Sequence, residues 1–356
     1  MAASGVSGYA AISARVRAMY SSLLSPQELT RLSDSPDFQS LLAQLKPTIY
    51  GSYIEELKEK ELTPRRVVFQ IKGRLADVYD SVIHMAPEHT RPLLTQLYRY
   101  FEVENLKAVL RGIVTDPTWE RVRDVLFPYG SMSVLPLQAM VEAGNVSAAV
   151  ELLRGTVYEE TLSFAMKRYS AEQNLFPLEV ALDLNYWRKL WQETKRLPSK
   201  DQQQALRVVG SLIDMNNLMW AIRYRVYHEL SEEELINYTL PFGYHLRDDD
   251  IRSIAAGADI ASVVQRVYPD MPDLNILLEE PRSGLPLLEL QLKQNLMKQC
   301  MSAFVGDPFH IGIPLAYLVL CELEIQDMTV LLEATFSQVS EEKYRPYLLK
   351  TALDKA

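Results

Sequence analysis

Two sequence patterns each occur three times in this chain of 356 residues. The first is a stretch of 27 residues that aligns without a gap and begins at Leu24, Met132 and Leu246. The second is a shorter marker centred on an acid, found at Glu102, Asp214 and Glu324. Both recur about every 110 residues, so two independent patterns report one period. Threefold reuse of one structural unit is therefore the strongest constraint on the fold.

Each copy of the 27-residue repeat predicts a helix in its second half. Its fourteenth position is a short polar residue suited to capping a helix start: Asp37, Asn145 and Asp259. Apolar residues then follow at the i, i+3, i+4, i+7 spacing that places them on one helical face. In the first copy these are Phe38, Leu41, Leu42 and Leu45. A shorter helix precedes, and Ser25 to Glu28 supplies its capping box with Pro26 at the first helical position.

The second marker also has helical spacing, and its shared face predicts one buried contact made three times. An asparagine or aspartate stands three residues after the first acid, and an apolar residue stands four residues after it. In two copies an arginine stands nine residues after the acid. The sets are Glu102, Asn105, Leu106 and Arg111; Asp214, Asn217, Leu218 and Arg223; Glu324, Asp327 and Met328. Triplication favours a structural role over a chemical one. Glu333 replaces the arginine in the third copy, which leaves open whether that copy makes the same contact.

The remaining long segments are amphipathic and give no alternating strand pattern. They cover residues 67–82, 178–197 and 287–305. The predicted fold is all-α, with three pseudo-equivalent helical domains of about 110 residues. Such units form either a curved solenoid or a ring of approximate threefold symmetry with a central hollow.

The ends of the chain bear on that choice. Residues 14–29 match residues 220–235 without a gap, which suggests that the chain starts midway through a unit. If the units close around an axis, the two ends should lie close together, whereas an open superhelix would keep them apart. The predicted divisions are helical repeats at 21–125, 126–235 and 236–356, with residues 1–20 and 320–356 as closing helices.

Composition excludes several classes of function. The net charge of −9 with no block of Lys and Arg argues against nucleic-acid binding. Cys300 and Cys321 have no paired spacing, so we expect neither a disulfide framework nor a zinc site, and a reducing compartment. No glycine-rich phosphate loop is present. The longest apolar run, 311–321, is well short of the ~20 residues that span a bilayer.

The sequence offers little metal or catalytic chemistry. His84, Glu88 and His89 surround a proline in a loop-like pattern and lack the HExxH spacing of a helical metal site. Residues 248–250 are three consecutive aspartates, which invite comparison with the magnesium motifs of helical enzymes. Acids also favour a helix N-terminus, and no second acidic motif is available to face them. We expect no catalytic residue, cofactor or metal. A magnesium-dependent enzyme remains an alternative that titration with magnesium and pyrophosphate would detect.

Five segments together resemble one known family. They are YAAISARVRAMYSSLLSPQEL, FEVENLKAVLRG, the PYG turn at 128–130, the PFG turn at 241–243 and DMNNLMWAIRYR. In combination they resemble the C subunit of the V/A-type ATPases, the equivalent of the d subunit of the eukaryotic vacuolar proton pump. The resemblance covers nearly the whole chain.

The resemblance implies a funnel-shaped, all-helical rotor subunit with a central cavity. Such a subunit is a non-catalytic socket between the central shaft of the soluble ATPase head and the cytoplasmic loops of the membrane proteolipid ring. It would lie in the cytoplasm at the inner face of the cell membrane, take part in ion transport and ATP synthesis, and bind no nucleotide itself. The candidate contacts with these partners are Arg17, Glu232, Glu233, Asp248 and Asp249.

One further alternative is a stand-alone helical scaffold with unrelated protein partners. Composition and repeats alone support no more than that. A pull-down from native membranes separates the two interpretations, because only the rotor subunit would bring down a rotary ATPase.

Overall fold

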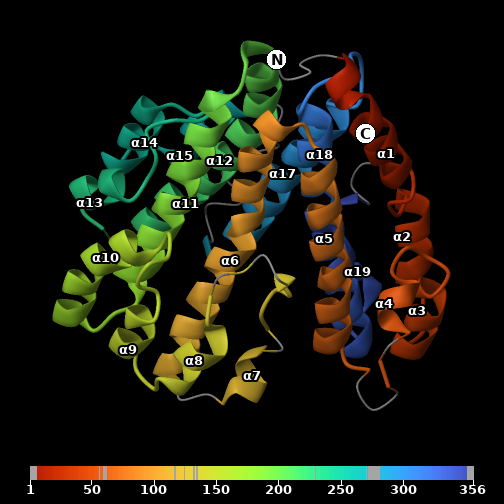
Figure 1. The fold of residues 1–356 in the computed structure, drawn as a ribbon, viewed down its shortest axis with the longest axis horizontal. Helices are drawn as coiled ribbons and strands as arrows, with labels where there is room; N and C mark the ends of the chain where they lie inside the picture. Colours follow the sequence, from red (N-terminus) through yellow and green to blue (C-terminus); the bar gives the residue numbers. More distant parts are fainter. Residues whose placement is uncertain are drawn as a thin grey trace.

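The computed structural model describes residues 6–350 except positions 56, 59–61, 116–117, 124, 131–132, 134, 229, 270 and 272–280. Met132, the first residue of the second 27-residue repeat, lies outside that set. Within the described residues every regular element is a helix (Figure 1), so the predicted all-α class is confirmed. None of these helices combines the length and the apolar composition that a bilayer crossing requires.

Six long helices form the body of the molecule. Three of them carry the acid marker, and we call these the signature helices: α6 (Arg91–Val114), α12 (Ser199–Tyr227) and α18 (Gly312–Phe336). The other three contain the amphipathic stretches, and we call these the flanking helices: α5 (Pro64–Met85), α11 (Phe176–Arg196) and α17 (Pro281–Ser302). The two sets alternate along the chain.

The long helices also alternate in space, and their contacts close on themselves. Helix α6 packs against α5 and α11, α12 packs against α11 and α17, and α18 packs against α17 and α5. The last of these pairs joins the end of the chain to its beginning. Because every signature helix lies between two flanking helices, the middle of the molecule is a continuous cycle of packed helices (Figure 1).

The 27-residue repeats form pairs of short helices at the periphery of this body. The pairs are α2 (Pro26–Ser33) with α3 (Phe38–Leu45), α8 (Leu137–Glu142) with α9 (Val146–Glu151), and α14 (Asp248–Ala255) with α15 (Ile260–Val267). The predicted caps are confirmed in all three copies. Asp37, Asn145 and Asp259 accept hydrogen bonds from the third backbone amide of their helices at 2.8–2.9 Å. The capping box of Ser25 and Glu28 is also present.

The remaining elements are mostly short. One short helix follows each signature helix: α7 (Trp119–Arg123), α13 (Glu232–Asn237) and α19 (Glu341–Tyr344). The others are α1 (Val6–Tyr20), α4 (Gly51–Ile54), α10 (Glu159–Glu172) and the 3-10 turns Glu88–Thr90 and Arg345–Tyr347.

Helix α18 explains the longest apolar run of the sequence. It contacts α1, α3, α5, α12 and α17, so its first half is surrounded by other helices. Every residue from Ile311 to Cys321 is buried. Continuous apolar sequence is what a helix surrounded by other helices requires.

The first and last described segments of the chain are in contact. The Lys350 ammonium donates a hydrogen bond to the Leu24 carbonyl at 2.7 Å, and the Tyr344 hydroxyl donates one to the Ser33 carbonyl at 2.9 Å. Arg17 on α1 donates to the Phe304 carbonyl, just beyond α17, at 3.0 Å. These segments lie side by side, as expected of units that close around an axis.

Candidate functional site

The signature acids are buried and bind the start or end of a 27-residue repeat. Glu102 accepts a hydrogen bond from the Tyr158 hydroxyl at 2.6 Å, and Glu324 accepts one from the Tyr50 hydroxyl at 2.5 Å. Both tyrosines are the last residue of their repeat. Glu324 also accepts from the Leu24 amide at 2.9 Å. Thus the first repeat of the sequence docks on the last signature helix, which completes the cycle.

The second acid holds a turn instead of a tyrosine. Asp214 is fully buried, and its carboxylate accepts from the backbone amides of Tyr244 and His245 at 2.8 and 2.6 Å. This is possible because Gly243 precedes them in the PFG turn. A Cβ at Gly243 would lie 1.9 Å from one oxygen of Asp214. The glycine is therefore required for the close approach of the turn to the carboxylate.

The signature asparagines each clamp one residue before a Pro-aromatic-Gly turn. Asn105 donates to the Phe127 carbonyl at 2.9 Å and accepts from the Phe127 amide at 2.7 Å. Asn217 makes the same pair of bonds to Leu240, at 2.7 and 2.8 Å. An amide side chain, unlike a carboxylate, can both donate and accept in this geometry.

The third copy keeps the contact but changes its chemistry. Asp327 accepts from the backbone amides of Leu349 and Lys350 at 2.5 and 3.1 Å. A carboxylate only accepts hydrogen bonds, and here two amides face it instead of an amide and a carbonyl. Lys350 also directs its ammonium group at Glu324. The third signature helix therefore binds an equivalent segment, although its sequence has diverged.

The signature arginines join neighbouring long helices. Arg111 donates two hydrogen bonds to Glu179 of α11 at 2.6 and 2.7 Å, and Arg223 donates one to Glu289 of α17 at 2.6 Å. The two arginine side chains are 58% and 43% exposed, so water screens both pairs and their contribution to stability is small. Glu333 occupies the corresponding position of α18.

A cavity of about 130 Å³ lies between the signature helices, bordered by α11 and α17. The residue two positions before each signature acid lines it: Tyr100, Leu212 and Glu322. Equivalent positions of three helices therefore meet at one place. The Tyr79 hydroxyl donates a hydrogen bond to Glu322. Burial raises the pKa of Glu322 to about 7, and the bond from Tyr79 opposes that shift.

A second carboxylate links the starts of the signature helices. The carboxylate of Asp201, in the first turn of α12, lies 3.1 Å from the imidazole of His89, which belongs to the 3-10 turn before α6. It also accepts from the Ile311 amide at the start of α18, again at 3.1 Å. Asp201 is 6% exposed. Sequence reasoning considered His89 with His84 and missed this partner, because an acid near a helix start is ordinary.

The candidate partner contacts are spread over two regions. Arg17 lies over the Phe304 ring, 5.7 Å from its centre, as well as bonding its carbonyl, so it joins α1 to the end of α17. Glu232, Glu233 and Asp249 are exposed at the starts of α13 and α14, which pack together.

The aspartate cluster is largely engaged within the protein. Asp248 pairs with Arg252 at 2.6 Å. Asp250 pairs with Arg266 and accepts from its own helix start, the Arg247 amide, at 2.8 Å. In the described part of the chain, no group of three or more His, Cys, Asp or Glu side chains is placed to hold a metal ion.

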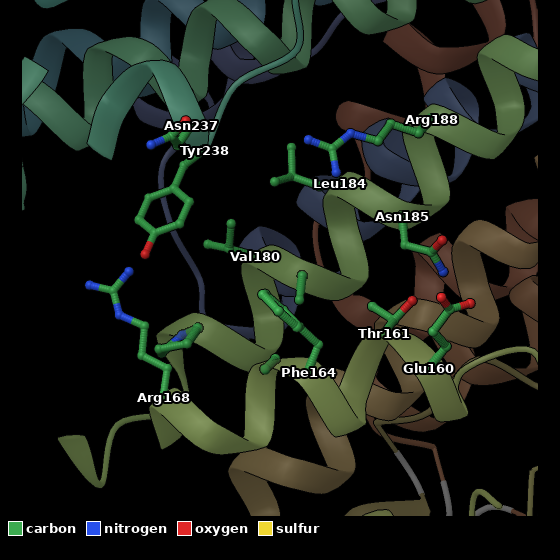
Figure 2. A pocket seen from close by; sticks show the side chains of 13 residues that line it. Glu160, Thr161, Phe164, Arg168, Val180, Leu184, Asn185, Arg188, Asn237 and Tyr238 are labelled. Atoms are coloured by element: carbon green, nitrogen blue, oxygen red, sulfur yellow. The ribbon is translucent and has the colours of Figure 1, made fainter. Parts of the chain in front are cut away.

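A surface groove of about 580 Å³ runs between α10, α11 and α13 (Figure 2). Val180 and Leu184 form its floor on α11, and Phe164 of α10 is 78% exposed beside them. On one side Arg168 lies over the Tyr238 ring, 5.5 Å from its centre, and pairs with Glu234 at 3.1 Å. These contacts tie α10 to α13.

Comparison with known proteins identifies the family. The model of the ATP synthase (C/AC39) subunit family matches residues 12–347. The A-type ATP synthase C subunit of Methanocaldococcus jannaschii is 24% identical over 345 residues, covering 96% of this chain and 86% of the relative. That of Methanothermobacter thermautotrophicus is 25% identical, covering 89% and 81%. That of Pyrococcus abyssi is 22% identical, covering 95% and 89%.

These matches confirm the resemblance to the C subunit of the V/A-type ATPases. The family match runs through all three signature helices and all three 27-residue repeats. The chain belongs to the ATP synthase (C/AC39) subunit family, a subunit of that complex that is not itself catalytic.

Proposed function

We propose that this chain is a rotor subunit of its ATP synthase and acts as a socket between two partners. One face receives the central shaft of the soluble head, and the other rests on the cytoplasmic loops of the membrane proteolipid ring. The subunit is then peripheral to the inner face of the cell membrane. Its task is mechanical, because torque must pass between ring and shaft without loss to bending.

The observation that carries this proposal is the closed cycle of the six long helices. An open chain of helices unwinds under torsion, whereas a closed one resists it through every interface. The buried bonds of Leu24 and Tyr50 to Glu324 hold the cycle shut. Closely packed protein interiors are also poorly compressible, which suits the transmission of force.

The proposed architecture follows the same cycle. Three units of about 110 residues, 21–125, 126–235 and 236–356, stand around an approximate threefold axis, and residues 1–20 and 320–356 close the ring. In this proposal the cavity lined by Glu322 would lie on that axis and form part of the inside of a funnel.

A reconstitution tests the proposal. The chain is added to the soluble head carrying its shaft and to detergent-solubilised proteolipid ring, and assembly is followed by size-exclusion chromatography. We expect the chain to bind each partner and to bring both into one complex. Co-elution of head and ring without the chain, or failure of the chain to bind either, would overturn the proposal.

A further inference from the structure

The central cavity contains one carboxylate that no charged partner among the described residues neutralises. Two carboxylates line it, Glu289 and Glu322. Glu289 pairs with Lys293 at 2.7 Å and with Arg223 at 2.6 Å. Glu322 bonds to the Tyr79 hydroxyl, and no basic side chain of the described residues pairs with it.

Glu322 is partly buried. Withdrawing an unpaired carboxylate from water, even in part, costs free energy, so a stable fold keeps one where it serves a purpose. The equivalent positions on the other signature helices hold Tyr100 and Leu212, which need no charged partner. The acid therefore does not belong to the repeated packing pattern. Among the signature helices it is specific to α18, and it lines the shared cavity.

We propose that the cavity is a receptor for one basic side chain, a lysine or arginine at the tip of the shaft, which pairs with Glu322. This inference rests on the proposed socket function and names the contact within it. The cavity of about 130 Å³ accepts a single side chain. It is too small for a helix, which is about 10–12 Å across with its side chains.

Several of the other lining residues suit a cation, and the Lys293 ammonium that also lines the cavity is itself paired with Glu289 at 2.7 Å. Tyr100 and Trp187 present aromatic rings, which attract cations over their faces. Asn216 donates its amide to the Leu212 carbonyl at 2.8 Å, which leaves its own oxygen as a further acceptor. A hydrogen bond between charged groups is stronger than one between neutral groups.

The surrounding groups predict how binding depends on pH. The titratable neighbours of Glu322 are Tyr79 of α5, Tyr100 of α6, Tyr186 of α11, and Glu289, Lys293 and Cys300 of α17. Burial raises the pKa of the tyrosines and of Cys300, so these groups stay neutral near pH 7. Glu322 has a pKa of about 7 and must lose its proton to pair with a cation. Affinity for the shaft should rise between pH 6 and 8, a range set around that value.

The test measures binding of the full chain to the purified shaft subunits by biolayer interferometry. Glu322→Gln keeps an acceptor for Tyr79 and removes the charge. Glu342→Gln, an exposed position on α19, changes the net charge equally and serves as the control. We expect Glu322→Gln to weaken binding about tenfold or more and to abolish the rise with pH. The control should match the wild type.

The outcomes separate the two proposals. Wild-type chain that binds the shaft only as tightly as Glu322→Gln overturns this inference and leaves the socket function standing. Wild-type chain that does not bind the shaft overturns both. If Glu322→Gln fails to fold, the pH profile of the wild type decides, since an affinity unchanged between pH 6 and 8 contradicts pairing through Glu322.

Discussion

The imidazole of His89 lies 3.1 Å from the carboxylate of Asp201, although 112 positions separate the two residues. The same carboxylate binds the Ile311 amide, so one side chain joins the starts of α6, α12 and α18. Hydrogen bonds at this point hold the three signature helices together at their starts.

Asp201→Ala should therefore destabilise the protein by about 1–3 kcal/mol, because the Ile311 amide is left buried without an acceptor. Urea unfolding monitored by circular dichroism measures the change. Asp249→Ala removes an exposed carboxylate and should stay within about 0.5 kcal/mol of wild type. Equal effects of the two substitutions would show that the joint contributes nothing.

Gly243→Ala should destabilise the PFG turn, because the new Cβ would overlap an oxygen of Asp214 at 1.9 Å. Overpacking of this kind costs about 1–3 kcal/mol. Gly73→Ala is the matched control, since its nearest neighbour would be 3.8 Å away on Tyr53. Gly73 lies inside α5, where alanine is the better helix former by up to about 1 kcal/mol. The melting temperature should fall for Gly243→Ala and rise for Gly73→Ala.

Asn217→Asp copies the third signature into the second. The new carboxylate would face the Leu240 carbonyl, to which Asn217 donates at 2.7 Å, and would lose that bond. We expect a loss of about 1–3 kcal/mol in unfolding free energy. The reciprocal substitution is Asp327→Asn, which keeps the size of the side chain. It should also destabilise the protein, because one of the two backbone amides that donate to Asp327 loses its acceptor. If either substitution left the unfolding free energy unchanged, that position would accept an amide and a carboxylate equally well.

Glu322 should make the protein less stable as the pH rises. Its pKa is raised from 4.5 in the unfolded chain to about 7 in the fold, so the folded state holds its proton more tightly. Stability from this group is present at low pH and is lost between these two values. Glu322→Gln removes that loss, so its melting temperature relative to wild type should increase from pH 5 to pH 8. A difference independent of pH, as expected for Glu342→Gln, would contradict the assignment.

The exposed acids Glu232, Glu233 and Asp249 are the remaining candidate contacts with basic partners. If they bind the shaft or the ring electrostatically, affinity should fall as salt increases. Replacing all three by their amides should reduce that salt dependence, which titrations at low and high ionic strength would reveal. Salt dependence that is the same in both proteins would assign the interaction to other residues.

Much of the local structure could be predicted because it follows from short-range rules. Caps at Asp37, Asn145 and Asp259 need only the residues that follow them. The shared tyrosine at the end of two repeats, Tyr50 and Tyr158, was a visible signal of the contacts with the signature acids and was missed.

Long-range contacts were harder to predict. The match of residues 14–29 to 220–235 aligns α2 with α13, whereas the hydrogen bonds of the signature acids relate α2 to α14. The match reflects a shared Ser-x-x-Glu capping box, present at Ser25 and at Ser231, which any helix start can carry. Glu322 gave a weak signal as an acid at the edge of the longest apolar run, but its surroundings depend on three helices at once.

The docking of the first repeat on α18 has a consequence during synthesis. Leu24 and Tyr50 leave the ribosome 300 and 274 residues before Glu324, their acceptor. At about 5–20 residues per second, this is a wait of roughly 15–60 seconds. The first repeat therefore reaches its final contacts only after α18 has been synthesised. In a prematurely truncated chain the surface that α18 normally covers would stay exposed to proteases.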